Sequence, residues 1–208
     1  MRAARLTSLV AAGVLAATAA LTATPAQAAR GTTSLAEVLA ADGNRLDRNW
    51  NDFDIVEKAV YAVLRAKPNS AVGVLADGNT RLTAFVPTDR AFRRLVFQLA
   101  GVRAPNERAV LRAVRSVADA DTLETILLYH VVPGAPIKYA TARKADGAAL
   151  TTAQGRRIRV NVLPHQIALR DRDFDAVNPK ILKAARNVNK GNRQIAHGIS
   201  QVLRPIDL

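Results

Sequence analysis

The sequence predicts an α+β fold, with helices in its first half and short strands in its second half. Between residues 34 and 130, apolar residues recur at intervals of three and four, which is the spacing of helices that bury one face. After Gly134 the apolar runs become short, and turn pairs such as Asp146-Gly147 and Gln154-Gly155 separate them. Helices followed by strands are typical of α+β folds and not of alternating α/β folds.

The first 28 residues have the order of a cleavable secretory signal. Arg2 and Arg5 precede an apolar run over 6–21, and Ala26 and Ala28 are the small residues expected before a cleavage site. We therefore expect export, with a signal peptide over 1–28, a short mature N-terminal segment over 29–33 and one domain over 34–208. The predicted location is extracellular or associated with the cell wall.

Composition limits how this domain is held together and how it is retained. None of the 208 residues is a cysteine, so neither a disulfide framework nor a lipid-bearing thiol is available. No stretch after the signal is long and apolar enough to cross a bilayer, so we expect a soluble domain without transmembrane anchoring. A chain of about 180 residues can bury roughly 70% of its unfolded surface without disulfide support.

Start and stop signals divide the first half of the domain into helices around one strand. Ser34 and Glu37 form a capping box, and Asp52 or Asp54 starts a second helix that must stop before Pro68. The next predicted elements are a strand over Leu82–Val86 and a helix from Thr88 to Gly101. Another predicted helix starts at Asn106 and carries one apolar stripe, formed by Val110, Leu111, Val114 and Val117. The last predicted helix is capped by Asp121 and Glu124, and Pro133-Gly134 closes it. Four phenylalanines are expected in the core: Phe53, Phe85, Phe92 and Phe97.

Short strands are predicted for the second half. The segment Arg157–Val162 alternates cleanly, so one face should be buried and the other should carry arginine and asparagine. The remaining predicted strands are Ile137–Ala142, Ala149–Ala153, Ile167–Arg170 and a closing strand over Gln194–Leu203, with a short helix at Pro179–Arg186.

Little in the sequence points to catalysis, a metal or a cofactor. His130, His165 and His197 match no metal-binding spacing, and no serine lies in a nucleophile elbow, although spacing alone does not exclude a Ser-His-Asp triad. The run 171–175 opens like a calcium loop, but Ala176 and Leu182 replace the required glycine and glutamate, so we predict a solvated turn. The chain is therefore predicted not to be an enzyme and to need neither cofactor nor metal.

Basic residues exceed acidic ones by thirteen in the whole chain. Removal of Arg2 and Arg5 with the signal would lower this net charge by two, to +11. Such an excess suggests the hypothesis of an anionic partner, such as a cell-wall or matrix polymer, although surplus arginine on a solvated surface is the favoured explanation. Nucleic acid is not an expected partner. The candidate basic surface consists of Arg90, Arg93, Arg94, Arg156, Arg157 and Arg159.

Three sequence boxes together resemble the fasciclin (FAS1) domain family. They are Leu82–Phe92, which reads LTAFVPTDRAF; Leu127–Gly134, which reads LLYHVVPG; and Gln194–Pro205, which reads QIAHGISQVLRP. Their order and spacing agree with those of the family over roughly residues 34–208. The resemblance implies N-terminal helices packed against a twisted mixed sheet or β-sandwich wedge. The family-motif residues here, structural or binding, are Thr88, Asp89, Tyr129, His130 and His197.

The box residues also have a physical interpretation of their own. Thr88 and Asp89 lie where a strand turns into a helix, so both suit helix capping. His130 follows an apolar stripe and is expected to be a buried, neutral imidazole. We hypothesise that it bonds to Thr88 or Asp89 and so fastens the first box to the second. His197 alternates with Ile195 and Ile199 along one strand, which favours a core position.

The resemblance implies function by contact, because fasciclin domains take part in cell adhesion and matrix association. In some animal members an acidic segment before the closing strand is linked to receptor binding, but here Lys180 stands in the place of the acid. Partners are therefore expected to be an anionic polymer or a surface protein. A second hypothesis is a carrier of a small hydrophobic ligand such as a lipid or pigment, and a third is a hydrolase that uses His130 or His197.

Overall fold

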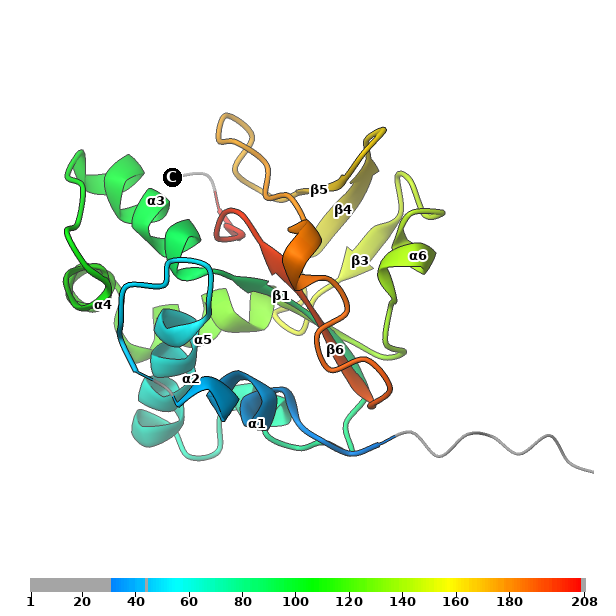
Figure 1. The fold of residues 1–208 in the computed structure, drawn as a ribbon, viewed down its shortest axis with the longest axis horizontal. Helices are drawn as coiled ribbons and strands as arrows, with labels where there is room; N and C mark the ends of the chain where they lie inside the picture. The colour runs from blue at the N-terminus through cyan, green and yellow to red at the C-terminus, as the bar shows by residue number, and fades with distance from the viewer. Residues whose placement is uncertain (1–30, 44, 207–208) are drawn as a thin grey trace, which may run out of the picture.

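A computed structural model describes residues 31–43 and 45–206 of the chain. Most of the helices lie on one side of a central three-stranded sheet, and a second three-stranded sheet lies on the other side (Figure 1). This arrangement confirms the predicted α+β class. The predicted signal at 1–28 lies outside the described residues. Among those residues, no helix is long and apolar enough to cross a membrane.

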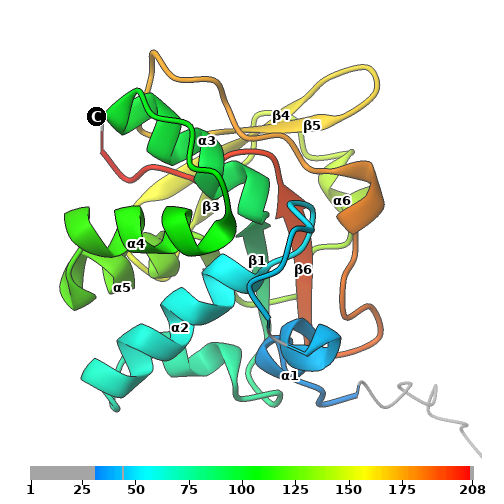
Figure 2. The same cartoon turned by 60° about the vertical axis from the view of Figure 1, so that its left-hand side comes forward.

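Five α-helices and two 3-10 turns form the helical side (Figure 2). The Ser34–Glu37 capping box is present, Asn106 caps its helix, and Gly101 ends another helix in the left-handed conformation, all as predicted. The elements are α1 (Leu35–Leu39), η1 (Ala40–Asp42), α2 (Asp54–Ala66), η2 (Ala71–Leu75), α3 (Asp89–Ala100), α4 (Glu107–Val117) and α5 (Ala120–Tyr129).

Three predicted helix details are wrong. Thr88 occupies the position before α3, but its side chain makes no capping hydrogen bond. The cap of α5 is Asp119 and not Asp121, because the Asp119 carboxylate accepts from the backbone N–H of Thr122. Val117 is 72% exposed at the last turn of α4, where the helix has passed beyond the core.

The central sheet has the order β2-β1-β6 and joins the three boxes. Strand β1 (Leu82–Pro87) pairs antiparallel with β2 (Val131–Pro133) and parallel with β6 (Gln194–Ile199). Strands β1 and β6 are buried along their whole length, which fits a parallel pair covered on both faces. Pro133 therefore ends a strand that follows α5, and does not directly close the helix as predicted.

The second sheet is an antiparallel meander of β3 (Ala149–Thr151), β4 (Arg157–Val162) and β5 (Ile167–Arg170). In β4, Ile158 and Val160 are buried while Arg157 and Arg159 are exposed, so the predicted alternation is confirmed. The predicted strand over Ile137–Ala142 is wrong, because the chain forms the helical turn α6 (Tyr139–Ala142) there. The predicted helix over Pro179–Arg186 is present only as the 3-10 turn η3 (Lys183–Ala185). The closing strand, predicted to reach Leu203, ends at Ile199.

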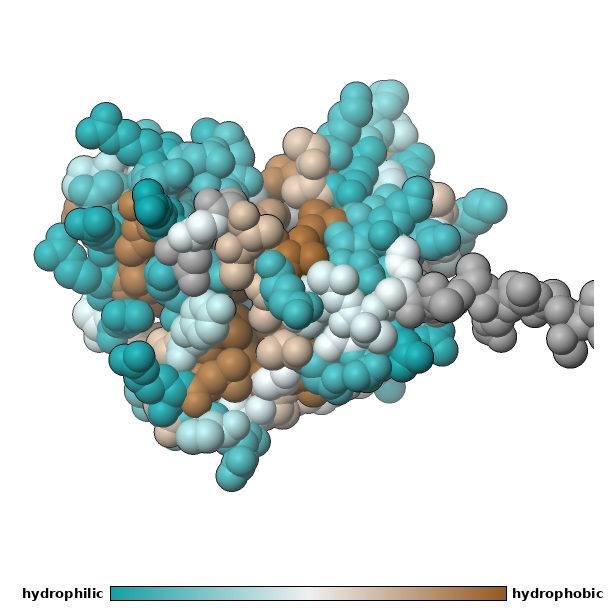
Figure 3. All heavy atoms as spheres, turned by 60° about the horizontal axis from the view of Figure 1, so that its bottom comes forward, coloured by the Kyte–Doolittle hydropathy of each residue, from teal (hydrophilic) through white to brown (hydrophobic). Residues whose placement is uncertain are grey.

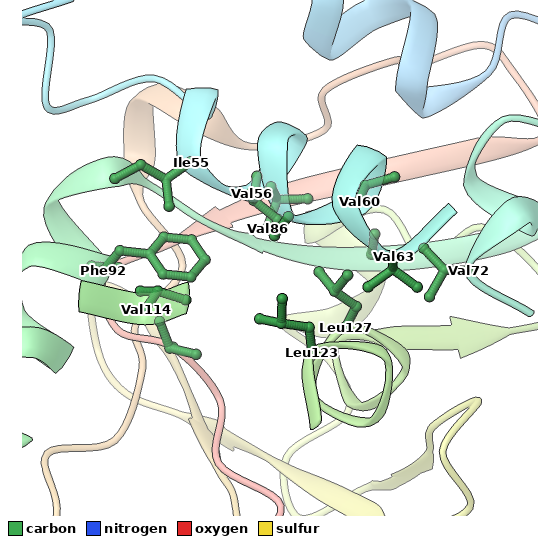
Figure 4. Close-up of a cluster of buried hydrophobic side chains, with 14 of the residues drawn as sticks. Ile55, Val56, Val60, Val63, Val72, Val86, Phe92, Val114, Leu123 and Leu127 are labelled. Carbon is green, nitrogen blue, oxygen red and sulfur yellow. The ribbon is translucent and has the colours of Figure 1, made fainter. Parts of the chain in front are cut away.

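Two hydrophobic cores share the central sheet as a common wall. The helices α2 to α5 pack on Ala84, Val86 and Ala196 (Figure 4). Residues of the opposite face, Phe85 and Ile199, pack against β4, β5 and α6 in the second core. Phe97 belongs to neither core, because it is 43% exposed on α3, contrary to the prediction.

Gly198 on β6 shows how closely the segment before the closing strand packs. A Cβ atom at this position would lie 2.5 Å from the Cβ of Ala185 in η3 and 3.2 Å from the ring of Phe53. The backbone N–H of Leu182 also donates to the carbonyl of Gly198 at 2.8 Å. The absence of a side chain at 198 therefore lets η3 lie directly on the central sheet.

We expect Gly198→Ala to lower the free energy of unfolding by about 1–3 kcal/mol, because the added methyl group overpacks this contact. Adding Ala185→Gly should recover part of the loss, since it removes the atom that the new methyl group meets. Urea unfolding of both single variants and the double variant measures the coupling. Additive effects of the two substitutions would contradict the contact.

Candidate functional site

Four of the family-motif residues lie where the central sheet meets α3 and α5, and His197 lies on β6. Tyr129 is fully buried at the end of α5, and its hydroxyl donates to the backbone carbonyl of Arg157 at 3.2 Å. Burial raises the pKa of the Tyr129 phenol. This bond connects the helical side of the protein to β4 of the second sheet.

The ring of His130 contacts two different parts of the chain. It is 5% exposed, its Nδ1 lies 2.8 Å from the carbonyl of Ile126, and its Nε2 lies 2.9 Å from the backbone N of Leu203. These partners require Nδ1 to donate and Nε2 to accept, so the ring is the neutral Nδ1–H tautomer. Burial lowers the pKa of His130 to about 4, and the prediction of a buried neutral imidazole is confirmed.

The predicted bond from His130 to Thr88 or Asp89 is wrong. The ring instead reaches the segment after β6, so its side chain fastens the second box to the third. The first and second boxes are joined by the backbone, where the N–H of Phe85 donates to the carbonyl of His130 at 2.9 Å. His130 thus contacts both other boxes through different atoms.

His197 lies in the core between the sheets, as predicted. Its exposed fraction is 1%, and its ring stacks on Phe85 with 6.0 Å between centroids. Nε2 lies 2.8 Å from the carbonyl of Ile137, and Nδ1 accepts from the backbone N–H of Asn187 at 3.3 Å. Burial lowers the pKa of His197. Both ring nitrogens therefore contact the backbone, which leaves neither lone pair nor proton directed at a substrate.

Thr88 and Asp89 are buried where β1 turns into α3. The N–H of Thr88 donates to the carbonyl of Ile199 at 3.3 Å, and Oδ1 of Asp89 accepts from the N–H of Ile55 at 2.9 Å. Asp89 therefore caps α2, which begins one residue earlier at Asp54, and does not cap its own helix. Burial raises the pKa of Asp89 to about 8, and the neighbouring Asp52 and Glu107 carboxylates add to this.

None of the five family-motif residues offers a contact surface. Their exposed fractions run from 0% to 5%, so they cannot touch a large partner unless the domain opens. We therefore assign them to holding the helices and the two sheets together. His165, by contrast, is exposed in the turn between β4 and β5 and lies with neither of the other histidines.

The candidate basic surface does not form one continuous group, because its arginines lie in three places. Arg90, Arg93 and Arg94 lie on α3, where Arg93 donates to the carbonyl of Ala104 and places its guanidinium 4.4 Å from the ring centre of Trp50. Arg94 donates to the carbonyl of Ser200 at 2.9 Å. Arg93 and Arg94 therefore already donate hydrogen bonds within the protein. Arg157 and Arg159 lie on β4, and Arg156 directly precedes that strand.

Arg157 and Arg159 of β4 line a surface hollow of about 520 Å³ together with Arg170 and Arg172, which the sequence analysis did not select. We call these four residues the arginine hollow. All four side chains are exposed. Arg159 and Arg170 stand directly opposite each other in the β4–β5 register. The short turn between these two predicted strands was the signal that could have placed Arg170 beside Arg159.

The segment Asp171–Asp175 beside this hollow is not the solvated turn that was predicted. Asp173 is 2% exposed and forms an ion pair with Arg204, and Oδ2 of Asp171 accepts from the backbone N of Arg204 at 2.8 Å. The Arg204 guanidinium also donates to the amide oxygen of Gln98 on α3. These bonds tie the loop to the end of the chain.

A groove of about 670 Å³ lies between α3, α4, α5 and the segment after β6. Arg156, the remaining candidate, lines it together with Arg204. Most other lining side chains are apolar, and Leu99 and Ile206 are about half exposed within it. On the face shown in Figure 3, hydrophobic residues form patches between hydrophilic ones.

The low pKa of His130 makes its contribution to stability dependent on pH. Between about pH 6.5 and about pH 4 the unfolded chain takes up a proton at this ring and the folded chain does not, so the folded state loses stability as pH falls. The free energy lost through His130→Gln should therefore be smaller at pH 4 than at pH 7 by on the order of 3 kcal/mol. Urea unfolding of both proteins at the two pH values measures this, and a cost independent of pH would contradict it.

Comparison with known proteins agrees with the three boxes. No curated protein matches the chain. One similar solved structure is the FAS1 domain pair of the insect cell adhesion molecule Fasciclin I, with 18% identity, a TM-score of 0.43 and coverage of 70% of this chain and 44% of that chain. The present chain thus spans less than half of that structure. Residues 58–205 match the sequence profile of the Fasciclin domain, so the chain belongs to the fasciclin (FAS1) domain family, a family of cell-adhesion-type and often extracellular domains.

Proposed function

We propose that this fasciclin domain is an exported, non-catalytic binding module that holds an anionic cell-wall or matrix polymer through the arginine hollow. The observation that carries the proposal is the cross-strand pair Arg159 and Arg170. Like charges directly opposite on neighbouring strands destabilise a sheet. An anionic group lying between the two guanidinium groups would remove this repulsion.

The surroundings of the pair support a polymer as partner. Arg157 and Arg172 extend the positive charge along the same hollow. Phe174 is 75% exposed beside them, with the Arg172 guanidinium 5.9 Å from its ring centre. Asp171 also lines the hollow, but its carboxylate is occupied by the backbone N of Arg204. Several cations beside an exposed aromatic ring suit a chain of repeated anionic groups better than a single small anion.

We expect Arg157→Gln/Arg159→Gln to weaken retention on immobilised dextran sulfate by about tenfold, since two exposed charge contacts of about 0.7 kcal/mol each amount to that factor. Retention of the wild-type protein should fall as salt rises. The matched control is Arg108→Gln/Arg112→Gln on α4, where both residues are exposed and the same charge is removed. Equal losses in the two double variants, or retention that salt does not change, would contradict the proposal.

A second candidate function is the transport of a small hydrophobic ligand in the groove between α3, α4 and α5. Its volume of about 670 Å³ falls within the range of about 300–1,000 Å³ that is usual for ligand pockets. The exposed Arg156 lines the same groove, so the ligand that fits best is a lipid with an acidic head group; Arg204 also lines it but is already paired with Asp173. Leu99, which is 49% exposed, would be covered by such a ligand.

For the groove, we expect saturable binding of the fluorescent fatty acid cis-parinaric acid. Leu99→Gln should weaken it roughly fivefold, because about 1 kcal/mol of apolar burial is lost. Val177→Gln is the matched control, since Val177 is 62% exposed and does not line the groove. Absence of saturable binding, or equal losses in both variants, would rule out the carrier function.

A further inference from the structure

Three helices begin at one place in the fold, and each brings a buried carboxylate there. Asp54, Asp89 and Glu107 are the first residues of α2, α3 and α4. The loop before α2 adds Asp52, which is partly buried, and Asp47, which is exposed. We call these five residues the acidic cluster. The acidic cluster is not evident from the sequence, because each acid alone is ordinary at a helix start or in a loop.

The oxygen atoms of the acidic cluster form two overlapping groups of three, and each group is compact enough to hold one ion. Those of Asp52, Asp89 and Glu107 lie within 4.8 Å of one another, and so do those of Asp47, Asp54 and Glu107. Oxygen ligands lie about 2.3–2.6 Å from Ca²⁺, so two ligands of one ion are at most about 5 Å apart. Glu107 belongs to both groups, which places its carboxylate at the centre of the cluster.

Glu107 and Asp89 also lack the partners that buried carboxylates need. Glu107 is 0% exposed, and among the described residues neither of its carboxylate oxygens has a hydrogen-bond partner outside the acidic cluster. Asp89 is equally buried, and its Oδ2 has no such partner although Oδ1 accepts from Ile55. Burying an unpaired carboxylate costs more free energy than the favourable interaction with a helix N-terminus provides. The arrangement therefore calls for a further positive group at the centre of the cluster.

We propose that the acidic cluster binds a hard divalent cation of the Ca²⁺ type. Its donors are all oxygen atoms, which hard cations prefer, and no nitrogen or sulfur ligand is among them. The loop residues Asp47, Asn49 and Asn51 follow the alternating order that opens many calcium loops, although Asp52 replaces the usual glycine. The exposed Asp47 side chain marks the solvent side, from which an ion would enter.

Protons are the competing occupants of the cluster. Burial and the neighbouring Asp52, Asp47 and Asp54 carboxylates raise the pKa of Glu107 to about 7. If the acids simply remain protonated, calcium will have no effect on the protein. If a cation binds, it will displace these protons and connect the loop to the starts of α2, α3 and α4.

Trp50 provides a direct probe of the proposed site. It is the only tryptophan of the chain, and its backbone carbonyl accepts from the N–H of Arg90, next to Asp89. Terbium bound in the cluster should emit when the indole of Trp50 is excited, and Ca²⁺ should displace it. Glu107→Gln should weaken terbium binding by about tenfold or more. Glu124→Gln is the matched control, because Glu124 pairs with Lys67 and lies outside the cluster.

Thermal unfolding gives an independent measurement on the same proteins. At a Ca²⁺ concentration about 100 times Kd, the Tm of the wild-type protein should lie roughly 5–10 °C above its value in EDTA. Glu107→Gln should lose this rise, yet in EDTA it should be at least as stable as wild type because one buried charge is gone. Wild-type protein with neither a calcium-dependent Tm nor emission through Trp50 would overturn the proposal. Emission that Glu107→Gln leaves unchanged would show adventitious binding only, and would overturn it as well.

Discussion

The parallel pairing of β1 with β6 is the interaction on which the rest of the structure depends. It joins the first strand of the chain to the last, and both strands are buried throughout. One face of the pair supports the helical core and the other supports the core between the sheets. At the start of β6, the amide of the fully buried Gln194 accepts from the N–H of Leu35 and donates to the carbonyls of Val74 and Asp77. The closing strand therefore positions the helical layer as well as the sheet.

Sequence signals predicted elements well where local chemistry decides them. The capping box at Ser34, the cap at Asn106 and the left-handed Gly101 need only neighbours along the chain, and all three are present. The strand predicted over Ile137–Ala142 failed because packing of Tyr139 toward His197 and Arg186 is a tertiary effect. Strand β2 is only three residues long, and its pairing with β1 cannot be seen in its own sequence.

The box residues were identifiable from sequence, but their partners were not. His130 accepts from the backbone N–H of Leu203, which lies 73 positions further along the chain. The predicted partners, Thr88 and Asp89, lie nearer in the sequence. The apolar stripe that precedes His130 was enough to predict a buried, neutral ring. The direction in which Nε2 points depends on the tertiary fold and could not be predicted. The acidic cluster could not be predicted for the same reason, since only the packing of three helix starts brings Asp54, Asp89 and Glu107 to one place.

Net charge conceals how this domain distributes its charged groups. The chain as a whole carries an excess of thirteen basic residues, yet five carboxylates meet at the starts of three helices, while four arginines surround a hollow at the second sheet. Exposed charges act over a Debye length of about 8 Å at physiological ionic strength, so a partner responds to the local group and not to the total. The two features also differ in burial, because the arginines are exposed and the central acids are not. An anionic polymer can therefore meet the arginines without reaching the acids, and a small cation is the one kind of charged partner that the buried acids can admit.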